Sequence, residues 1–187
     1  SFENCRITGL ILKDSLFKDS RFKNCSISDS DFTRCIFNGF EYLADDNESI
    51  TKDSKFNNCS FIDISFKNNL SSCIFAGCDY VSFHIANIKL TDINFSGENM
   101  VGNDLRRSHF VSCNFNGTEL QHALAKGTAQ TQTVFENCIF TDANLTNADF
   151  GYVVFSRCVF EWADFTNTNL RHSSINGTPP EEMPELF

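Results

Sequence analysis

A large apolar residue recurs at every fifth position over most of this chain. The pattern is clearest between Thr133 and Ile175, where a small or modest residue also stands two positions before each large one. The large positions there are Phe135, Phe140, Leu145, Phe150, Phe155, Phe160, Phe165, Leu170 and Ile175. A period of five matches neither the 3.6 of an amphipathic helix nor the 2 of a half-buried strand. The five-residue segment is therefore a structural repeat.

The repeat extends over most of the 187 residues. It runs without a slip from Phe2 to Phe37, resumes at Phe56, shifts by one residue near 67–69 and then continues to Leu120. Residues 44–53 are polar and acidic, and in 121–132 the phase would place Gln130 inward, where an unpartnered buried amide costs about 1–3 kcal/mol. We therefore expect loop insertions near 44–53 and 121–132, the second bulging outward in part.

Nine cysteines would ordinarily suggest a disulfide framework or a metal site. Here each stands two residues before a large apolar residue, none forms a CxxC pair, and no histidine lies among them. They are Cys5, Cys25, Cys35, Cys59, Cys73, Cys78, Cys113, Cys138 and Cys158. A buried free cysteine behaves as a small hydrophobic residue. We interpret all nine as reduced core residues of a protein that works in a reducing compartment, the cytoplasm, and expect no metal or cofactor.

Charge and composition exclude several functions. The net charge of −9 argues against nucleic-acid binding, which depends on Lys and Arg contacts to phosphates. The chain has no run of 18 apolar residues, so no membrane span is expected. The four histidines fall in outward positions on different sides of a twenty-residue coil and cannot form one catalytic or metal-binding cluster. No catalytic residue is assigned, and this segment is not expected to be an enzyme.

Three triplets carry a family resemblance: Ala143-Asn144-Leu145, Ala148-Asp149-Phe150 and Ala163-Asp164-Phe165. They resemble the pattern of pentapeptide-repeat proteins, in which a small residue, Asp or Asn, and Leu or Phe precede two polar residues. The resemblance implies an all-β fold, a right-handed quadrilateral parallel β-helix (a pentapeptide-repeat solenoid) of about 8–9 coils over residues 1–177. Residues 178–187, rich in Pro and Glu, are expected to be a linker to a following domain.

Four units of five return the chain to its starting side, so residues twenty apart should stack at about 4.8 Å. One column is then expected to contain Phe75, Phe95, Phe115, Phe135, Phe155 and Ile175, and another Tyr80, Met100, Leu120, Phe140 and Phe160. The same rule places Asp104 and Asp164 in one column and Asp149 and Glu119 elsewhere, so acidic columns are expected to be sparse.

Outward positions supply the candidate binding residues. Val134 and Val154 should stack on one side and Ile139 and Val159 on the next, with Tyr152 and the single Trp162 pointing outward nearby. Such an apolar patch often marks a binding surface, although β-branched residues also simply favour strands. Leu16 and Ile36 form a smaller strip, and the acidic loop residues Asp45, Asp46 and Glu48 are a further candidate.

Two functions are compatible with this reading. The Phe- and Cys-rich units resemble the β-helix domain of type III-secreted HECT-like effector ubiquitin ligases (SopA-like). That resemblance implies a monomeric, protein-binding segment of a larger bacterial effector, secreted into the host cytoplasm. It would engage host proteins of the ubiquitin system, RING-type ligases or substrates, for an attached HECT-like E3 ligase whose catalytic motif this sequence does not contain. Because Ser1 opens mid-repeat without a cap, the chain is expected to be part of a longer protein. As the alternative, the acidic, interrupted rod resembles the quinolone-resistance pentapeptide-repeat proteins, which implies a DNA mimic that binds DNA gyrase.

Overall fold

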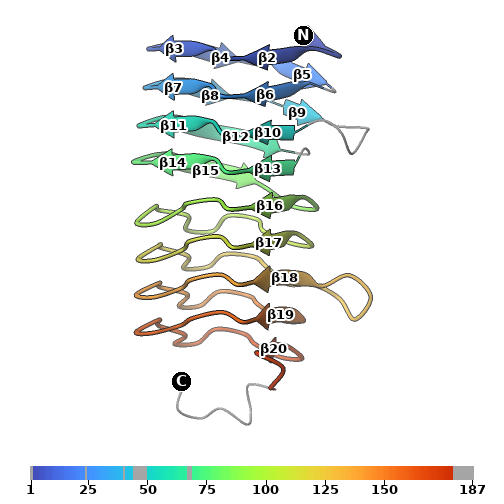
Figure 1. Ribbon diagram of the computed structural model, residues 1–187. Helices are drawn as coiled ribbons and strands as arrows, with labels where there is room; N and C mark the ends of the chain where they lie inside the picture. The colour runs from blue at the N-terminus through green and yellow to red at the C-terminus, as the bar shows by residue number, and fades with distance from the viewer. Residues whose placement is uncertain (1, 24, 40, 44–49, 67–68, 179–187) are drawn as a thin grey trace.

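In the computed structural model the chain forms a four-sided rod in which each turn stacks on the one before (Figure 1). The structure describes residues 2–23, 25–39, 41–43, 50–66 and 69–178. The strand pairs are parallel, from β1 with β5 at the start to β19 with β20 at the end. Within these ranges no segment is a helix long and apolar enough to cross a membrane. The predicted parallel β-helix is confirmed.

The four sides are numbered here in chain order. Side 1 contains β1 (Phe2–Glu3), β5 (Arg21–Lys23), β9 (Glu41–Leu43) and the C-terminal ends of β12 (Ser60–Phe66) and β15 (Asp79–His84). Side 2 contains β2 (Arg6–Thr8), β6 (Ser26–Ser28), β10 (Ile50–Lys52), β13 (Asn69–Ser71), β16 (Lys89–Thr91), β17 (His109–Val111), β18 (Thr133–Glu136), β19 (Val153–Ser156) and β20 (Ser174–Ile175). Side 3 contains β3 (Ile11–Lys13), β7 (Asp31–Thr33), β11 (Lys55–Asn57) and β14 (Ile74–Ala76). Side 4 contains β4 (Leu16–Lys18), β8 (Ile36–Asn38) and the first halves of β12 and β15. Sides 1, 3 and 4 then continue as ladders of single β-bridges.

The large inward residues stack in columns along the rod. On side 3 the rings of Phe95 and Phe115 are 5.4 Å apart, and those of Phe115 and Phe140 are 4.9 Å apart and nearly parallel. Phe135 belongs to side 2, where its ring stacks on that of Phe110 at 4.6 Å, and it meets Phe115 only edge-on at 5.8 Å. The predicted column that placed Phe115 above Phe135, and with it Leu120 above Phe140, is therefore wrong.

The cause of that error is the second insertion. Phe110 pairs with Phe135, 25 residues later, because the five residues 128–132 are exposed and project from the wall. The preceding residues stay in the rod, since Ala123 and Ala125 are fully buried. The insertion predicted at 121–132 is therefore confirmed only for its second half, and Gln130 does point outward as expected.

The first insertion is shorter than predicted. Ile50–Lys52 is strand β10, and Thr51 is fully buried in a large inward position, so the expected loop 44–53 is wrong over its last residues. A threonine in place of Phe hid this unit from the periodicity. Residues 44–49 lie outside the described chain. The one-residue slip is confirmed, because Phe61 pairs with Tyr80, 19 residues later.

Most corners are made by a residue with positive φ, two positions after the large inward residue, whereas β12 and β15 pass from side 4 to side 1 as continuous strands. Asn, Asp and Gly hold most of these positions because they tolerate the left-handed conformation. The Asn or Asp before the large residue supports the same corner: Oδ1 of Asn144 accepts the Thr146 N–H at 3.1 Å, and Oδ1 of Asp164 accepts that of Thr166 at 2.8 Å. The family triplet therefore encodes the turn as well as the core.

The small inward residues join successive coils. Ser108 Oγ donates to the Ile85 carbonyl at 2.6 Å and accepts the Ile88 N–H at 3.3 Å. The Cys158 thiol occupies the same position one side further and donates to the Phe135 carbonyl at 3.3 Å. All nine cysteines are free, and all except the half-buried Cys5 are buried. Their predicted place in the core is confirmed for the eight buried cysteines, and their polar role is an addition that spacing did not reveal.

Candidate protein-binding surface

The outward hydrophobic residues form two strips in neighbouring coils. Val134 pairs with Val154 on side 2, and Ile139 pairs with Val159 on side 3, as expected. Ile139 and Val159 are 42% and 43% exposed. None of the four can stabilise a corner as Asn and Asp do elsewhere at this position, so their exposure is not required by the turn. Leu16 and Ile36 are paired on side 4, as predicted.

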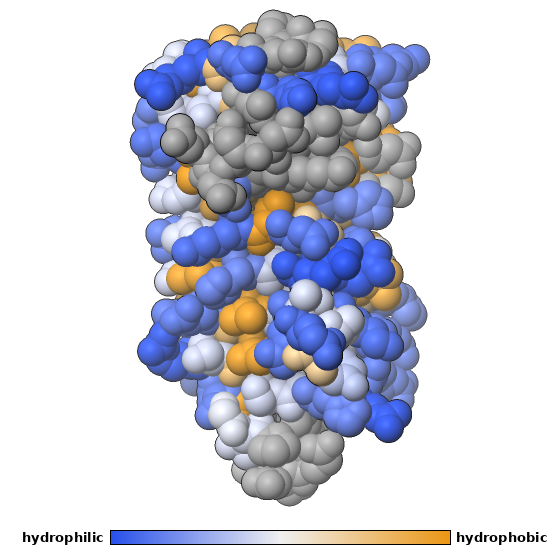
Figure 2. Space-filling view, turned by 90° about the vertical axis from the view of Figure 1, so that its right-hand side faces the viewer, coloured by the Kyte–Doolittle hydropathy of each residue, from blue (hydrophilic) through white to orange (hydrophobic). Residues whose placement is uncertain are grey.

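A charged network separates the two strips. At the corner between them, Arg157 Nε donates to Asn137 Oδ1 at 2.8 Å, and its Nη2 pairs with Glu136. His109 Nε2 lies 3.5 Å from the other oxygen of Glu136. Figure 2 shows the face from which residues 128–132 project, and its hydrophobic surface occurs as separate small areas among hydrophilic ones. The network of Arg157, Asn137 and Glu136 therefore divides the outward hydrophobic residues into two apolar strips rather than one continuous patch.

The two aromatic candidates lie at opposite edges of these strips. Tyr152 is half-buried at the corner between sides 1 and 2, where its ring lies 4.6 Å from that of His172. Trp162 is 87% exposed at the corner between sides 3 and 4. Both adopt positive φ, 57° and 61°, which is uncommon for bulky residues. The loop candidates Asp45, Asp46 and Glu48 lie outside the described residues.

Charge is divided between the sides of the rod, a feature that the sequence reading missed. From Ile74 to Asn167, sides 3 and 4 carry no Lys or Arg, while side 1 carries Arg106, Arg107 and Lys126, and Arg171 follows. Asp104, buried on side 1, binds Arg106 through two hydrogen bonds, at 2.8 and 2.7 Å. The outward acidic residues of sides 3 and 4 are all exposed: Asp79, Glu119, Asp142, Glu161 and Asp164.

The acidic columns also differ from the predicted ones. A single ladder on side 4 joins Asp79, Asn99, Glu119, Asn144 and Asp164. Asp104 instead shares a ladder on side 1 with Asp149. The expectation that Asp104 pairs with Asp164 is wrong because residues 128–132 rotate the register by one side. Glu119 and Asp164 therefore lie on the same side, which the periodicity had separated.

One carboxylate points inward. Glu98 occupies a small position and is 4% exposed, and its two oxygens accept the N–H groups of Gly77 at 2.8 Å and Cys78 at 2.9 Å. Burial raises the pKa of Glu98, against the lowering effect of these two bonds. Burial likewise raises the pKa of the neighbouring Tyr80 well above its usual value. Glu98 stands two residues before Met100 in the sequence, and that position was the available signal.

The histidines do not converge. His84 lies on side 1, 3.8 Å from Asp104, and His109 lies on side 2, while His122 and His172 stand at two different corners. Among the described residues no three His, Cys, Asp or Glu side chains are grouped as metal ligands.

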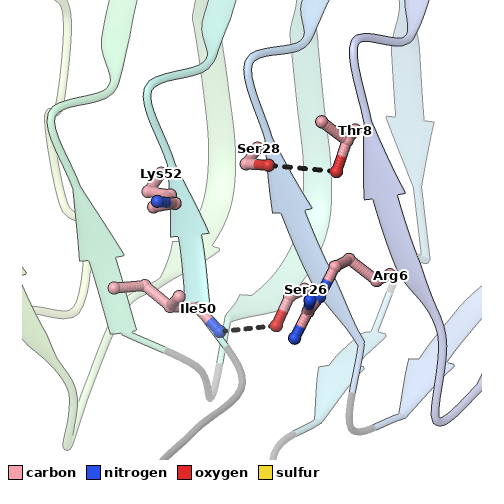
Figure 3. Close-up of a pocket in the computed structure, with 6 residues that line it drawn as sticks. All are labelled: Arg6, Thr8, Ser26, Ser28, Ile50 and Lys52. Atoms are coloured by element: carbon pink, nitrogen blue, oxygen red, sulfur yellow. Dashed lines mark hydrogen bonds between the residues drawn. The ribbon is translucent and has the colours of Figure 1, made fainter.

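A groove lies on side 2 near the other end of the rod (Figure 3). It has a volume of about 430 Å³ and is lined by outward residues of three adjacent strands: Arg6, Thr8, Ser26, Ser28, Ile50 and Lys52. The sequence reading assigned no role to these residues. Two of them are cations and three are hydroxyl-bearing, so the groove differs in chemistry from both apolar strips.

These features define a class: a stacked-coil β-helix whose distinguishing chemistry is on its outer surface. Eight copies of the family model described as pentapeptide repeats match residues 1–39, 87–124, 131–155 and 143–178. The chain belongs to the pentapeptide-repeat family. No curated protein sequence matches it.

Solved structures share the fold. A trypsin-treated variant of QnrB1, a plasmid-mediated fluoroquinolone resistance protein, matches with a TM-score of 0.66 and 14% identity, over 99% of this chain and 86% of that one. Full-length QnrB1 matches with a TM-score of 0.54 and 14% identity, over 94% of this chain and 91% of that one. At this identity the likeness establishes the β-helix and carries no residue-level correspondence.

Proposed function

We propose that this chain is a protein-binding rod that presents its acidic sides 3 and 4 to the basic surface of a DNA-binding protein, with DNA gyrase as the first candidate. The observation that carries the proposal is the separation of charge. Five exposed carboxylates and no Lys or Arg occupy sides 3 and 4 from Ile74 to Asn167. Electrostatic complementarity of this kind steers association and excludes acidic partners. The fold shared with a fluoroquinolone resistance protein supports gyrase as the first partner to test.

The density of negative charge on sides 3 and 4 determines how strongly they can compete with DNA for a binding site. Coils are about 4.8 Å apart, so five carboxylates over the four steps from Asp79 to Asp164 give about one charge per 4 Å of rod. Duplex DNA carries about one charge per 1.7 Å. The acidic surface is therefore less than half as dense as DNA, and charge alone would make it a weak competitor for a DNA site.

Exposed hydrophobic residues on the acidic sides supply the binding energy that charge alone does not. Trp162 stands at the corner between the two acidic sides, and Ile139 and Val159 lie on side 3 beside it. Tryptophan is prominent among residues that dominate binding energy, and it does so when surrounding contacts exclude water. We assign these three residues to the acidic contact surface. Val134, Val154 and Tyr152, across the Arg157 corner, form a separate second contact.

The test is binding of the purified chain to purified gyrase, with supercoiling in the presence and absence of a fluoroquinolone as the functional readout. The triple variant Asp79→Asn, Glu119→Gln, Asp164→Asn should weaken binding about tenfold and reduce its dependence on salt. A control with the same change in net charge, Asp29→Asn, Asp53→Asn, Asp92→Asn, alters the corner between sides 2 and 3 and should bind nearly as wild type. Failure of the wild-type chain to bind, or equal weakening by both variants, would contradict the proposal.

The hydrophobic anchors are tested separately. Trp162→Ala should weaken binding by tenfold or more, because a hot-spot residue contributes about 2 kcal/mol or more. Val154→Asn tests the second strip in the same binding assay, and its effect on the stability of the fold should be similar to that of Trp162→Ala. None of the described residues supports the hypothesis of a secreted ubiquitin-ligase segment. That hypothesis stays a prediction from the sequence.

A further inference from the structure

The groove on side 2 has a shape that follows directly from its residues. The middle strand, β6, contributes the short side chains of Ser26 and Ser28. The flanking strands contribute long ones, Arg6 from β2 and Ile50 and Lys52 from β10. Figure 3 shows Arg6 reaching from β2 toward Ser26. A low middle strand between two high ones makes a depression across an otherwise flat wall.

The hydroxyl groups of the groove keep hydrogen atoms that they can donate to a ligand. Ser26 Oγ accepts the Ile50 N–H at 3.4 Å, so its own hydroxyl hydrogen is available to a ligand. Thr8 Oγ1 and Ser28 Oγ are 3.3 Å apart, and whichever donates to the other leaves one hydroxyl hydrogen free. The floor therefore offers two hydroxyl donors.

The groove is also cationic, in a chain with a net charge of −9. The guanidinium of Arg6 has no ion-pair partner among the described residues. Lys52 Nζ lies 3.9 Å from Asp53 Oδ2, but both side chains are about half exposed, and a surface pair of this kind holds its cation weakly. None of the six lining residues is an acid. Two cations above two hydroxyl donors suit a tetrahedral oxyanion, which accepts several hydrogen bonds at once.

We propose that the groove formed by β2, β6 and β10 binds a phosphate or sulfate group, as the free anion or as a monoester. Arg6 and Lys52 provide charge-assisted hydrogen bonds from opposite edges, and the hydroxyls of Ser26 and of the Thr8–Ser28 pair contact the remaining oxygens. The site lies on a different side of the rod from the acidic surface and does not depend on the proposed function.

The experiment is a titration of the isotopically labelled chain with inorganic phosphate, sulfate and O-phosphoserine at constant ionic strength, followed by amide NMR shifts. Saturable shifts are expected at Ser26 and Ser28, with half-saturation at about 1–10 mM. Arg6→Gln and Lys52→Gln should each raise the half-saturation concentration about tenfold. Tighter binding of O-phosphoserine than of phosphate would support an ester ligand, and equal binding would support the free anion.

Two further variants separate the site from general attraction of anions. Lys55→Gln removes an exposed cation from the same coil, one side away, and should leave the titration unchanged. Ser28→Val fills the floor without altering charge and should abolish the saturable shifts. The proposal is overturned if no saturation is reached with wild type, if Lys55→Gln weakens binding as much as Lys52→Gln, or if Ser28→Val binds normally. Circular dichroism of each variant checks that the coils remain folded.

Discussion

Replacing Glu98 tests how the rod tolerates an inward carboxylate. In Glu98→Ala, the N–H groups of Gly77 and Cys78 lose their acceptors, which lie at 2.8 and 2.9 Å. Cys78 is buried, so its unpaired N–H should cost about 1–3 kcal/mol, whereas Gly77 is exposed and its N–H can bind water. A loss of about 1–3 kcal/mol is therefore expected, or about 2–4 °C in Tm for each kcal/mol in a chain of this size.

A serine at the same position should repair most of that loss. Ser108 accepts the Ile88 N–H in the equivalent place two sides further, so Glu98→Ser can accept the Cys78 N–H in the same way. The expected cost of Glu98→Ser is below about 1 kcal/mol. Urea unfolding followed by circular dichroism measures both variants. Equal destabilisation by Ala and Ser would refute the assignment of Glu98 as a hydrogen-bond acceptor between coils.

The pH dependence of the same variants has a definite sign. Burial raises the pKa of Glu98 above its ordinary value of 4.5, so the folded state binds the proton more tightly than the unfolded state. The stability that this proton contributes is fully present below about 4.5 and is lost as pH rises through the higher folded pKa. Wild type should therefore lose stability relative to Glu98→Ser as pH rises above 4.5. The opposite slope would mean that the two N–H bonds outweigh burial.

Three further perturbations test other parts of the rod. Gly127→Ala should lower the free energy of unfolding in urea by about 1–3 kcal/mol, because an added Cβ would lie 2.7 Å from the Thr131 carbonyl oxygen. An unchanged free energy of unfolding would mean that the backbone near Thr131 moves to make room for the added methyl group. Deleting residues 128–132 should leave Tm within a few degrees, since it restores a twenty-residue coil, and a large loss would contradict their placement outside the wall. Burial raises the pKa of Cys73 to about 11, and contact with Cys113 raises that of Cys138 to about 12. Both thiols should resist a disulfide reagent at pH 8 until the chain is unfolded, and rapid labelling of the folded chain would contradict their burial.

The periodicity predicted the inward residues wherever a unit carries a large apolar side chain, and it missed Thr51, where that side chain is small and polar. It could not predict which inward residues stack on which. An insertion of five residues leaves the phase unchanged, so the sequence predicted that part of 121–132 bulges outward but could not show that five residues, 128–132, leave the wall and shift the stacking by one side. The pairing of Phe115 with Phe140 follows only from the structure.

For the candidate surface, too, the sequence predicted which side chains point outward but not which of them stack together. The outward orientation of Val154 and Trp162 followed from phase alone. The acidic ladder that contains Glu119 and Asp164 depends on register, and the same insertion hid it. Glu98 was visible as an acid at a small position, but its partners are backbone groups one coil away, which no sequence pattern identifies.

The uneven charge of the sides gives the rod an electric dipole across its width. Over the coils from Ile74 onward, the negative edge is the corner that carries Trp162, and the positive edge is side 1. In the field of a charged partner such a body experiences a torque about its long axis and rotates before it makes contact. The orientation in which the rod first touches its partner is then selected during diffusion, and this selection weakens once the screening length falls below the width of the rod.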